Sequence, residues 1–204
     1  IRDDFHGTDG PIPVRRRQSG TAPDIQHAFR NALTGAGYST CEDTNGPNPE
    51  GIGVSPSNNI DGLRISAALG HLNPMRHSLN LTVRGNVLVR KVLFDGQKAI
   101  GVEAESGGEI FTIESERVVL SSGAIKSPHL LMLSGIGPKD QLDQFGIPVI
   151  KEVPGVGRNL FNHLSAQIAF EVKDGKTLIG DVDSAHFGLH YTSEGSNEKN
   201  DMVL

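Results

Sequence analysis

Cysteine is almost absent from this chain of 204 residues, and long apolar runs are missing altogether. The single cysteine, Cys41, cannot form a disulfide within the chain, so nothing in the sequence requires an oxidising compartment. No apolar run approaches the roughly 18 residues that a membrane-spanning helix needs, which predicts no transmembrane segment. The cytoplasm is favoured on these grounds, but no targeting segment identifies a compartment.

The sequence also lacks the features with which many enzyme chains begin and end. It opens at Ile1 without a methionine, a signal peptide or a strand followed by a GxGxxG loop, and it stops in the apolar run 202–204. These features predict a piece of a longer protein.

Basic residues are too few for a nucleic-acid-binding surface. The formal net charge is −5, and the only basic run is Arg15-Arg16-Arg17, beside Gln18-Ser19-Gly20. We interpret this run as a solvated loop rather than a phosphate site, and we expect no nucleic acid as a partner. The composition, 36% hydrophobic and 21% charged, is that of a globular chain with a sizeable core.

Hydrophobic periodicity predicts helices over residues 22–33 and 62–72. One face of the first helix is apolar at 3.6-residue spacing and consists of Ile25, Ala28, Phe29 and Ala32. Gly35 ends the first helix, and Asn73-Pro74 ends the second. Residues 38–62 are rich in glycine, proline and asparagine and are predicted to form a long polar loop.

From residue 79 the apolar period changes to two, which predicts an antiparallel meander. The predicted strands are 81–83, 87–94, 100–105, 110–114 and 117–120. Asp95-Gly96 and Ser106-Gly107-Gly108 supply turn residues suited to positive φ. The later elements are predicted as a helix over 139–145 and strands over 149–152 and 166–172.

The stretch 117–138, RVVLSSGAIKSPHLLMLSGIGP, is the most informative in the chain. Its apolar run 118–120 predicts a strand buried on both faces, and Gly123 lets the backbone turn and approach a ligand closely. Ser127 is a suitable N-cap and Pro128 suits the first helical position, while glycines 135 and 137 end the helix. The first N–H groups of such a helix can hold an anion. Taken alone, the pattern also suits a core crossover that binds nothing.

The string GAIKSPHLLMLSGIGP resembles the second signature of the glucose–methanol–choline (GMC) flavoprotein oxidoreductases. The resemblance continues through PGVGRNLFNH at 154–163, where Asn162 stands in place of the family's usual aspartate. Upstream, DGLRISAA at 61–68 and NLTV at 80–83 resemble two further family segments, although RHSLNL at 76–81 departs from the family's Arg-Pro-Asn-Leu. The matching segments occur in the correct order over about residues 5–170.

The resemblance implies an α/β (α+β) fold. Residues 61–165 would form the central part of an FAD-binding, Rossmann-like domain with an antiparallel β-meander. Residues 1–60 and 166–204 would belong to a substrate domain built on an antiparallel sheet.

The resemblance also implies three cofactor contacts. The backbone of Val89 would bond the adenine edge of FAD, and Gly123 and Ala124 would let the backbone approach its ADP portion. The alternatives are an ordinary strand valine at position 89 and simple packing of strand on helix at 123–124.

The activity implied is oxidation of the CH–OH group of a small alcohol by hydride transfer to the flavin, with O₂ or another molecule as electron acceptor. The family's catalytic histidine lies near the end of a much longer chain, so no residue here is predicted to be catalytic and the piece alone is expected to be inactive. Two alternatives stay open, namely an FAD-containing cyanohydrin lyase of the same family and a non-enzymatic binding module. No metal site is expected, because His186 and His190 lack a third ligand.

Overall fold

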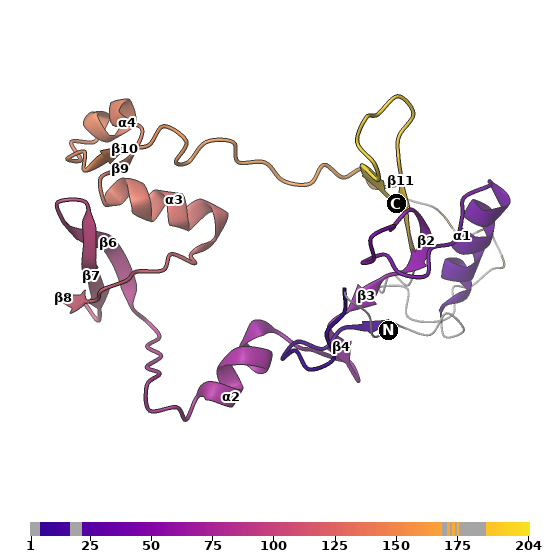
Figure 1. Cartoon of the computed structure of the whole chain (residues 1–204), viewed down its shortest axis with the longest axis horizontal. Coiled ribbons are helices and arrows are strands. Elements are labelled where there is room, and N and C mark those ends of the chain that lie inside the picture. The colour runs from indigo at the N-terminus through magenta and orange to yellow at the C-terminus, as the bar shows by residue number, and fades with distance from the viewer. Residues whose placement is uncertain (1–4, 17–21, 169–170, 172, 174, 176–186) are drawn as a thin grey trace. The chain divides into compact units, whose positions relative to one another are not determined.

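The computed structural model of the protein describes residues 5–16, 22–168, 171, 173, 175 and 187–204 (Figure 1). The chain divides into two compact units. The first comprises residues 1–81 and 169–204, and the second comprises residues 82–168. The fold combines helices with small, mainly antiparallel sheets, which confirms the predicted α/β class.

The first unit is centred on a helix and a three-stranded antiparallel sheet. These elements are α1 (Asp24–Gly35), β2 (Gly51–Val54), β11 (Phe187–Tyr191) and β12 (Met202–Val203). The strand order is β12-β11-β2, so β11 pairs both with the next strand in the chain and with β2, which lies far earlier in the sequence. Ile52, Phe187 and Leu189 form the buried cluster, and Phe29 and Leu33 of α1 pack against it.

The inner face of α1 is only partly the one predicted. Phe29 does pack inward, but Ile25 is 45% exposed. Polar side chains occupy the rest of the inner face, because the Gln26 amide oxygen accepts the Phe187 N–H at 3.2 Å and the Arg30 guanidinium lies over the Phe187 ring. Apolar spacing alone did not reveal this polar contact with a strand 161 residues away.

The long polar loop predicted over residues 38–62 is irregular over 38–50, but its second half contains strands. These are β2, β3 (Pro56–Ser57) and β4 (Asn59–Ile60), and β5 (Leu63–Arg64) follows directly. A further short strand, β1 (Arg15–Arg16), lies earlier in the chain. β1 pairs with β3, and β4 pairs with β5 across Asp61 and Gly62, whose φ angles are 50° and 81°. Two successive positive φ angles are typical of a type I′ hairpin turn.

Because of the β4-β5 hairpin, the next helix starts later in the chain than predicted. The predicted helix over 62–72 begins only after it, as a π-helical segment η2 (Ala68–Leu72) that continues into α2 (Asn73–Met75). Pro74 does not end this helix, because it lies in the first turn of α2, where the missing N–H removes little hydrogen bonding.

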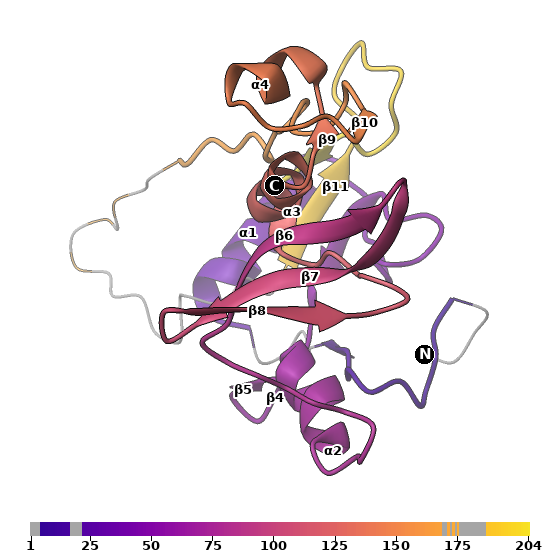
Figure 2. The ribbon, with the colours of Figure 1, turned by 90° about the vertical axis from the view of Figure 1, so that its left-hand side faces the viewer.

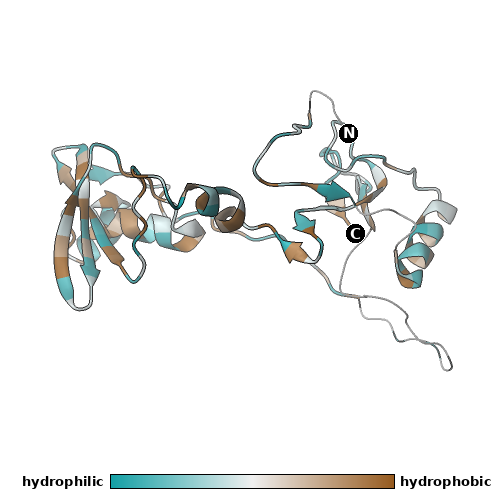
Figure 3. Ribbon diagram, turned by 90° about the horizontal axis from the view of Figure 1, so that it is seen from below, coloured by the Kyte–Doolittle hydropathy of each residue, from teal (hydrophilic) through white to brown (hydrophobic). Residues whose placement is uncertain are grey.

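The second unit contains the predicted meander as a sheet of order β6-β7-β8. Its strands are β6 (Leu88–Asp95), β7 (Lys98–Ser106) and β8 (Glu109–Glu114). The turn glycines Gly96, Gly107 and Gly108 all have positive φ, at 57°, 59° and 85°. Bands of hydrophobic and hydrophilic residues alternate along these strands at the left of Figure 3.

A helical layer follows the sheet. Its elements are α3 (Gly123–Leu133), β9 (Ile136–Gly137), α4 (Lys139–Gln144) and β10 (Lys151–Glu152). β9 and β10 pair in parallel, and α3 lies against β6 (Figure 2). The buried apolar side chains of this unit are Val92, Ala104, Leu130 and Leu142.

Several predicted features of the second unit are wrong. The predicted strands 117–120 and 81–83 are not formed, and Val119 is 85% exposed. A run that is apolar on both faces needs a neighbouring strand on each side, and within the described residues no strand pairs with 118–120. Residues 166–168 and 171 of the predicted strand 166–172 are irregular, and its other residues lie outside the described part of the chain.

The start of α3 also differs from the prediction. The helix begins at Gly123 rather than after Ser127, so Pro128 lies inside it. The Ser127 hydroxyl accepts the N–H of Ser122 at 3.0 Å, and so Ser127 supports the first turn from within the helix.

Candidate functional site

Val89 lies near the start of β6, on an edge strand. It pairs with Ala104 of β7 and is half-buried. Among the described strands β6 pairs with β7 alone, so the opposite edge of β6 can offer main-chain N–H and C=O groups to another molecule. This is the setting that recognition through the backbone of Val89 requires.

Gly123 and Ala124 form the first turn of α3, and both are exposed. Gly123 has a φ of 81°, and a Cβ added there would meet no atom within 4 Å. The space beside this backbone is therefore open. The first N–H groups of a helix have no partner within the helix, so they can donate to an anionic group.

A hydrogen bond joins β6 to the C-terminal end of α3. Ser134, which directly follows the helix, accepts the N–H of Val92 in β6 at 2.8 Å. The start of α3 lies away from the sheet, as Figure 1 shows. The structure thus places Val89 and the pair Gly123–Ala124 on two packed elements without direct contact between them.

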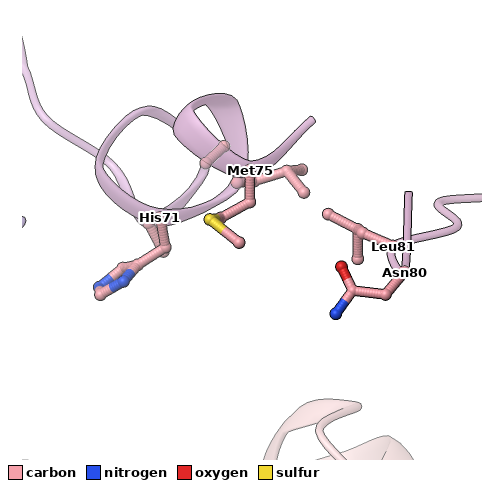
Figure 4. Close-up of a pocket in the computed structure, with 7 residues that line it drawn as sticks. His71, Met75, Asn80 and Leu81 are labelled. Atoms are coloured by element: carbon pink, nitrogen blue, oxygen red, sulfur yellow. The ribbon is translucent and has the colours of Figure 1, made fainter. Parts of the chain in front are cut away.

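An open, mainly apolar pocket of about 590 Å³ lies in the first unit, around η2 and α2. Its lining residues are Ala67, Ala68, His71, Leu72, Met75, Asn80 and Leu81. In Figure 4, Asn80 and Leu81 face the helical segment that carries His71 and Met75. None of the three predicted cofactor contacts lines this pocket.

Asp43 is the centre of a polar cluster that joins three segments of the first unit. Its carboxylate lies 2.9 Å from His6 Nε2, pairs with the Arg16 guanidinium and accepts the Asn45 N–H at 3.0 Å. Partial burial acts to raise the pKa of the Asp43 carboxyl, but the Asn45 N–H, the Arg16 guanidinium and the His6 ring together hold this pKa below its ordinary value.

The basic run at 15–17 is therefore not simply solvated. Arg16 is half-buried against Asp43, and Arg15 pairs with Asp61 at 3.1 Å, while Arg17 lies outside the described residues. Both arginines tie β1 to neighbouring loops.

Two classes of site are missing from the described part of the chain. Within it, no group of three or more His, Cys, Asp or Glu side chains could hold a metal ion. None of its helices is both long and apolar enough to cross a bilayer.

Comparison with protein families gives a match to GMC oxidoreductase over residues 2–165. The chain belongs to the GMC oxidoreductase family. Membership makes FAD the cofactor, as the resemblance of the sequence implied.

The GMC relatives include choline dehydrogenases. The chain is 44% identical over 165 residues to the mitochondrial choline dehydrogenase of Homo sapiens, covering 80% of this chain and 27% of the relative. It is 40% identical over 172 residues to an oxygen-dependent choline dehydrogenase of Pseudomonas putida, covering 82% and 30%. An uncharacterised GMC-type oxidoreductase of Rhodococcus erythropolis is 41% identical, with coverages of 80% and 33%. The chain thus spans about a third of the length of these relatives.

Solved GMC structures agree with the fold. Pyridoxine 4-oxidase from Mesorbium loti superposes with a TM-score of 0.71 at 32% identity, covering 76% of this chain and 30% of the enzyme. A formate oxidase superposes with a TM-score of 0.64 at 27% identity, covering 75% and 27%.

The main-chain groups at the start of α3 and along the outer edge of β6 fit FAD. The dinucleotide carries a pyrophosphate, which suits main-chain N–H donors, and an adenine whose edge suits a strand backbone. The open backbone at Gly123 and the outer edge of β6 provide these two kinds of group. The individual contacts of Val89, Gly123 and Ala124 with FAD remain predictions.

Two groups in the structure were not identified from the sequence. Ser134 could have been found as a polar side chain that directly follows the apolar run HLLML and precedes the glycine that ends the helix. The Asp43 cluster left no such signal, because its three side chains are 10 to 37 positions apart and are brought together only by the fold.

Proposed function

We propose that this chain forms part of an FAD-dependent oxidoreductase that oxidises the CH–OH group of a small alcohol. The observation that carries the proposal is an open glycine backbone at the start of α3 together with an edge of β6 that pairs with no other described strand, on a chain matched to the GMC family over 164 of 204 residues. The choline dehydrogenase relatives act, by name, on an alcohol. O₂ or another molecule would serve as the electron acceptor.

In this proposal the chain holds the cofactor and other segments carry the catalytic base. FAD supplies the two-electron oxidation when it is bound. The backbone of Val89 bonds the adenine edge, and the first turn of α3 at Gly123 and Ala124 donates to the pyrophosphate. No residue of this chain is assigned a catalytic role.

The experiment compares flavin content and flavin reduction in the holoprotein, meaning a longer protein that carries these 204 residues together with its bound FAD. Wild type is expected to purify with bound FAD that choline or another small alcohol bleaches under anaerobic conditions. The variant Gly123→Val is expected to lose most of its FAD, because a branched side chain at positive φ strains the turn and fills the open space.

Gly146→Val is the matched control. Gly146 also has a positive φ, of 66°, and also has no atom within 4 Å of an added Cβ, but it lies after α4. Equal FAD loss in both variants would contradict the contact at Gly123. Turnover of a cyanohydrin without flavin reduction by any alcohol would favour the lyase alternative instead.

A further inference from the structure

The Ser134 hydroxyl makes two hydrogen bonds in the interior of the second unit. Its Oγ donates to the carbonyl oxygen of Leu130 at 2.6 Å and accepts the N–H of Val92 at 2.8 Å. Ser134 is 5% exposed, and so is Val92. The hydroxyl therefore connects the last turn of α3 with the middle of β6 in a place that excludes water.

The N–H of Val92 is bonded by the Ser134 hydroxyl. A buried main-chain N–H that loses its partner is strongly unfavourable, and Val92 lies on an edge strand whose pairing with β7 leaves this N–H to the helix side. The bond to Leu130, in contrast, is an ordinary return of a serine hydroxyl to the carbonyl four residues earlier. Only the first bond fixes one element against another.

Val92 lies between two irregularities in the pairing of β6 with β7. The register of β6 on β7 shifts between Val89 and Lys91, and again between Leu93 and Phe94. Such irregularities bend a strand and increase its local twist. The bond from Ser134 falls between the two shifts, in the stretch 91–93 that pairs regularly with β7, so α3 is attached to the one regular part between two bends.

We propose that Ser134 is a positioning residue for FAD, because its hydroxyl holds α3 on β6 and thereby sets Gly123–Ala124 relative to Val89. This rests on the proposed function, since those residues are its predicted FAD contacts. Ser134 itself touches no part of the cofactor. Its effect on FAD is transmitted through the fixed orientation of the helix.

The test compares three substitutions in the holoprotein. Ser134→Ala removes the hydroxyl. Ser134→Cys keeps nearly the same volume with a much weaker hydrogen-bonding group, and Ser134→Thr keeps the hydroxyl. Dissociation of FAD is measured by flavin fluorescence, and the environment of the bound flavin by visible circular dichroism.

Ser134→Ala and Ser134→Cys are expected to weaken FAD binding about tenfold, which corresponds to about 1.4 kcal/mol. They should also alter the circular dichroism of the bound flavin and speed hydrogen exchange of the Val92 amide. Ser134→Thr is expected to retain wild-type values. If Ser134→Ala does not fold, the Cys variant decides the question.

Thr34→Ala is the matched control. The Thr34 hydroxyl makes the same return bond at the end of α1, to the Arg30 carbonyl oxygen at 3.0 Å, and its second contact, with the Asn31 carbonyl oxygen, stays within the same helix. We expect no change in FAD affinity from its loss. Variants at 134 that lose thermal stability but bind FAD as wild type does, with an unchanged flavin spectrum, would overturn the proposal. Failure of the wild-type holoprotein to bind FAD would instead overturn the proposed function.

Discussion

At the scale of single residues, Gly135 lies in a tightly restricted backbone environment of the second unit. Its φ is 83°, and an added Cβ would overlap the carbonyl oxygen of Pro148. Its own carbonyl accepts the N–H groups of Ile150 and Lys151, at 2.9 and 3.2 Å. The backbone of residue 135 is therefore fixed from two sides by the segment that leads into β10.

Gly135→Ala is expected to lower the free energy of unfolding by more than about 2 kcal/mol, because the positive φ and the overlap with Pro148 both oppose a side chain. Gly146→Ala, whose added Cβ meets nothing within 4 Å, should lose only about 1 kcal/mol. Urea unfolding of the two variants measures the difference. Similar losses would mean that the overlap with Pro148 is relieved by a small shift.

The conformation of a single residue was predictable where it depends on the local backbone alone. The sequence indicated a turn at Gly123, and the structure gives this glycine a positive φ. Ser134 was not predicted as a link to β6, because the hydrogen bond depends on a strand 42 residues away. The type of a residue indicates which backbone conformation it favours, but it does not indicate which distant residue its side chain will bond.

At the scale of elements, the Asp43 cluster joins the N-terminal segment at His6, strand β1 at Arg16 and the loop that precedes β2. A carboxyl group whose pKa is lower in the folded than in the unfolded chain stabilises the fold while it is ionised. Its contribution is complete above the ordinary carboxyl pKa of 3.8 and is lost as the pH falls below that value, through the lowered pKa of the folded chain.

We therefore expect the unfolding midpoint of wild type to fall more steeply below pH 4 than that of Asp43→Asn, which cannot ionise. Above pH 5 the variant should be the less stable of the two, because it lacks the ion pair with Arg16. Thermal unfolding in a series of buffers from about pH 3 to pH 7 measures both effects. Parallel curves for the two proteins would show that Asp43 contributes no pH-dependent stability.

The β7-β8 hairpin offers a stabilising change. Its two turn residues, Gly107 and Gly108, both have positive φ, which is the conformation that Asn-Gly favours. Gly107→Asn is expected to raise the free energy of unfolding by about 0.5 kcal/mol, because asparagine reduces the freedom of the unfolded chain. Gly108→Val should lower it, as judged by chemical denaturation, and the reverse order would argue against this turn type.

Strands were predictable where each one pairs with the next strand in the chain. The strands β6, β7 and β8 pair with the next strand in the chain, so alternation and turn glycines were sufficient to predict them. The run 118–120 and the segment 81–83 carry apolar patterns too, but within the described residues neither pairs with a strand. Helix 62–72 was misplaced because the Asp61-Gly62 turn was interpreted as a helix start instead of a hairpin.

At the scale of the whole molecule, the chain covers only about a third of its GMC relatives. The predicted limits of the FAD-binding part, 61 and 165, stay predictions beside the two units divided at residues 81 and 168. A binding site for a cofactor as long as FAD needs more than one strand edge and one helix start.

We expect these 204 residues alone to bind FAD weakly and to show no flavin bleaching with choline. Equilibrium titration of the purified chain with FAD, followed by fluorescence, measures the affinity. A longer protein that carries the same residues is the control and should bind FAD tightly. Stoichiometric FAD on the short chain would show that β6 and α3, without further segments, suffice for binding.

The exposed apolar side chains also determine how the chain behaves in solution. Among the described residues far more large apolar side chains are exposed than buried, and those of residues 160–168 include Phe161 and Leu164 at 89% and 102% exposure. Water in contact with so much apolar surface favours self-association. Sedimentation should therefore show a mass that rises with concentration, and dilute arginine or mild detergent should suppress the rise. For this chain, colloidal solubility rather than unfolding would set the practical limit on handling it alone.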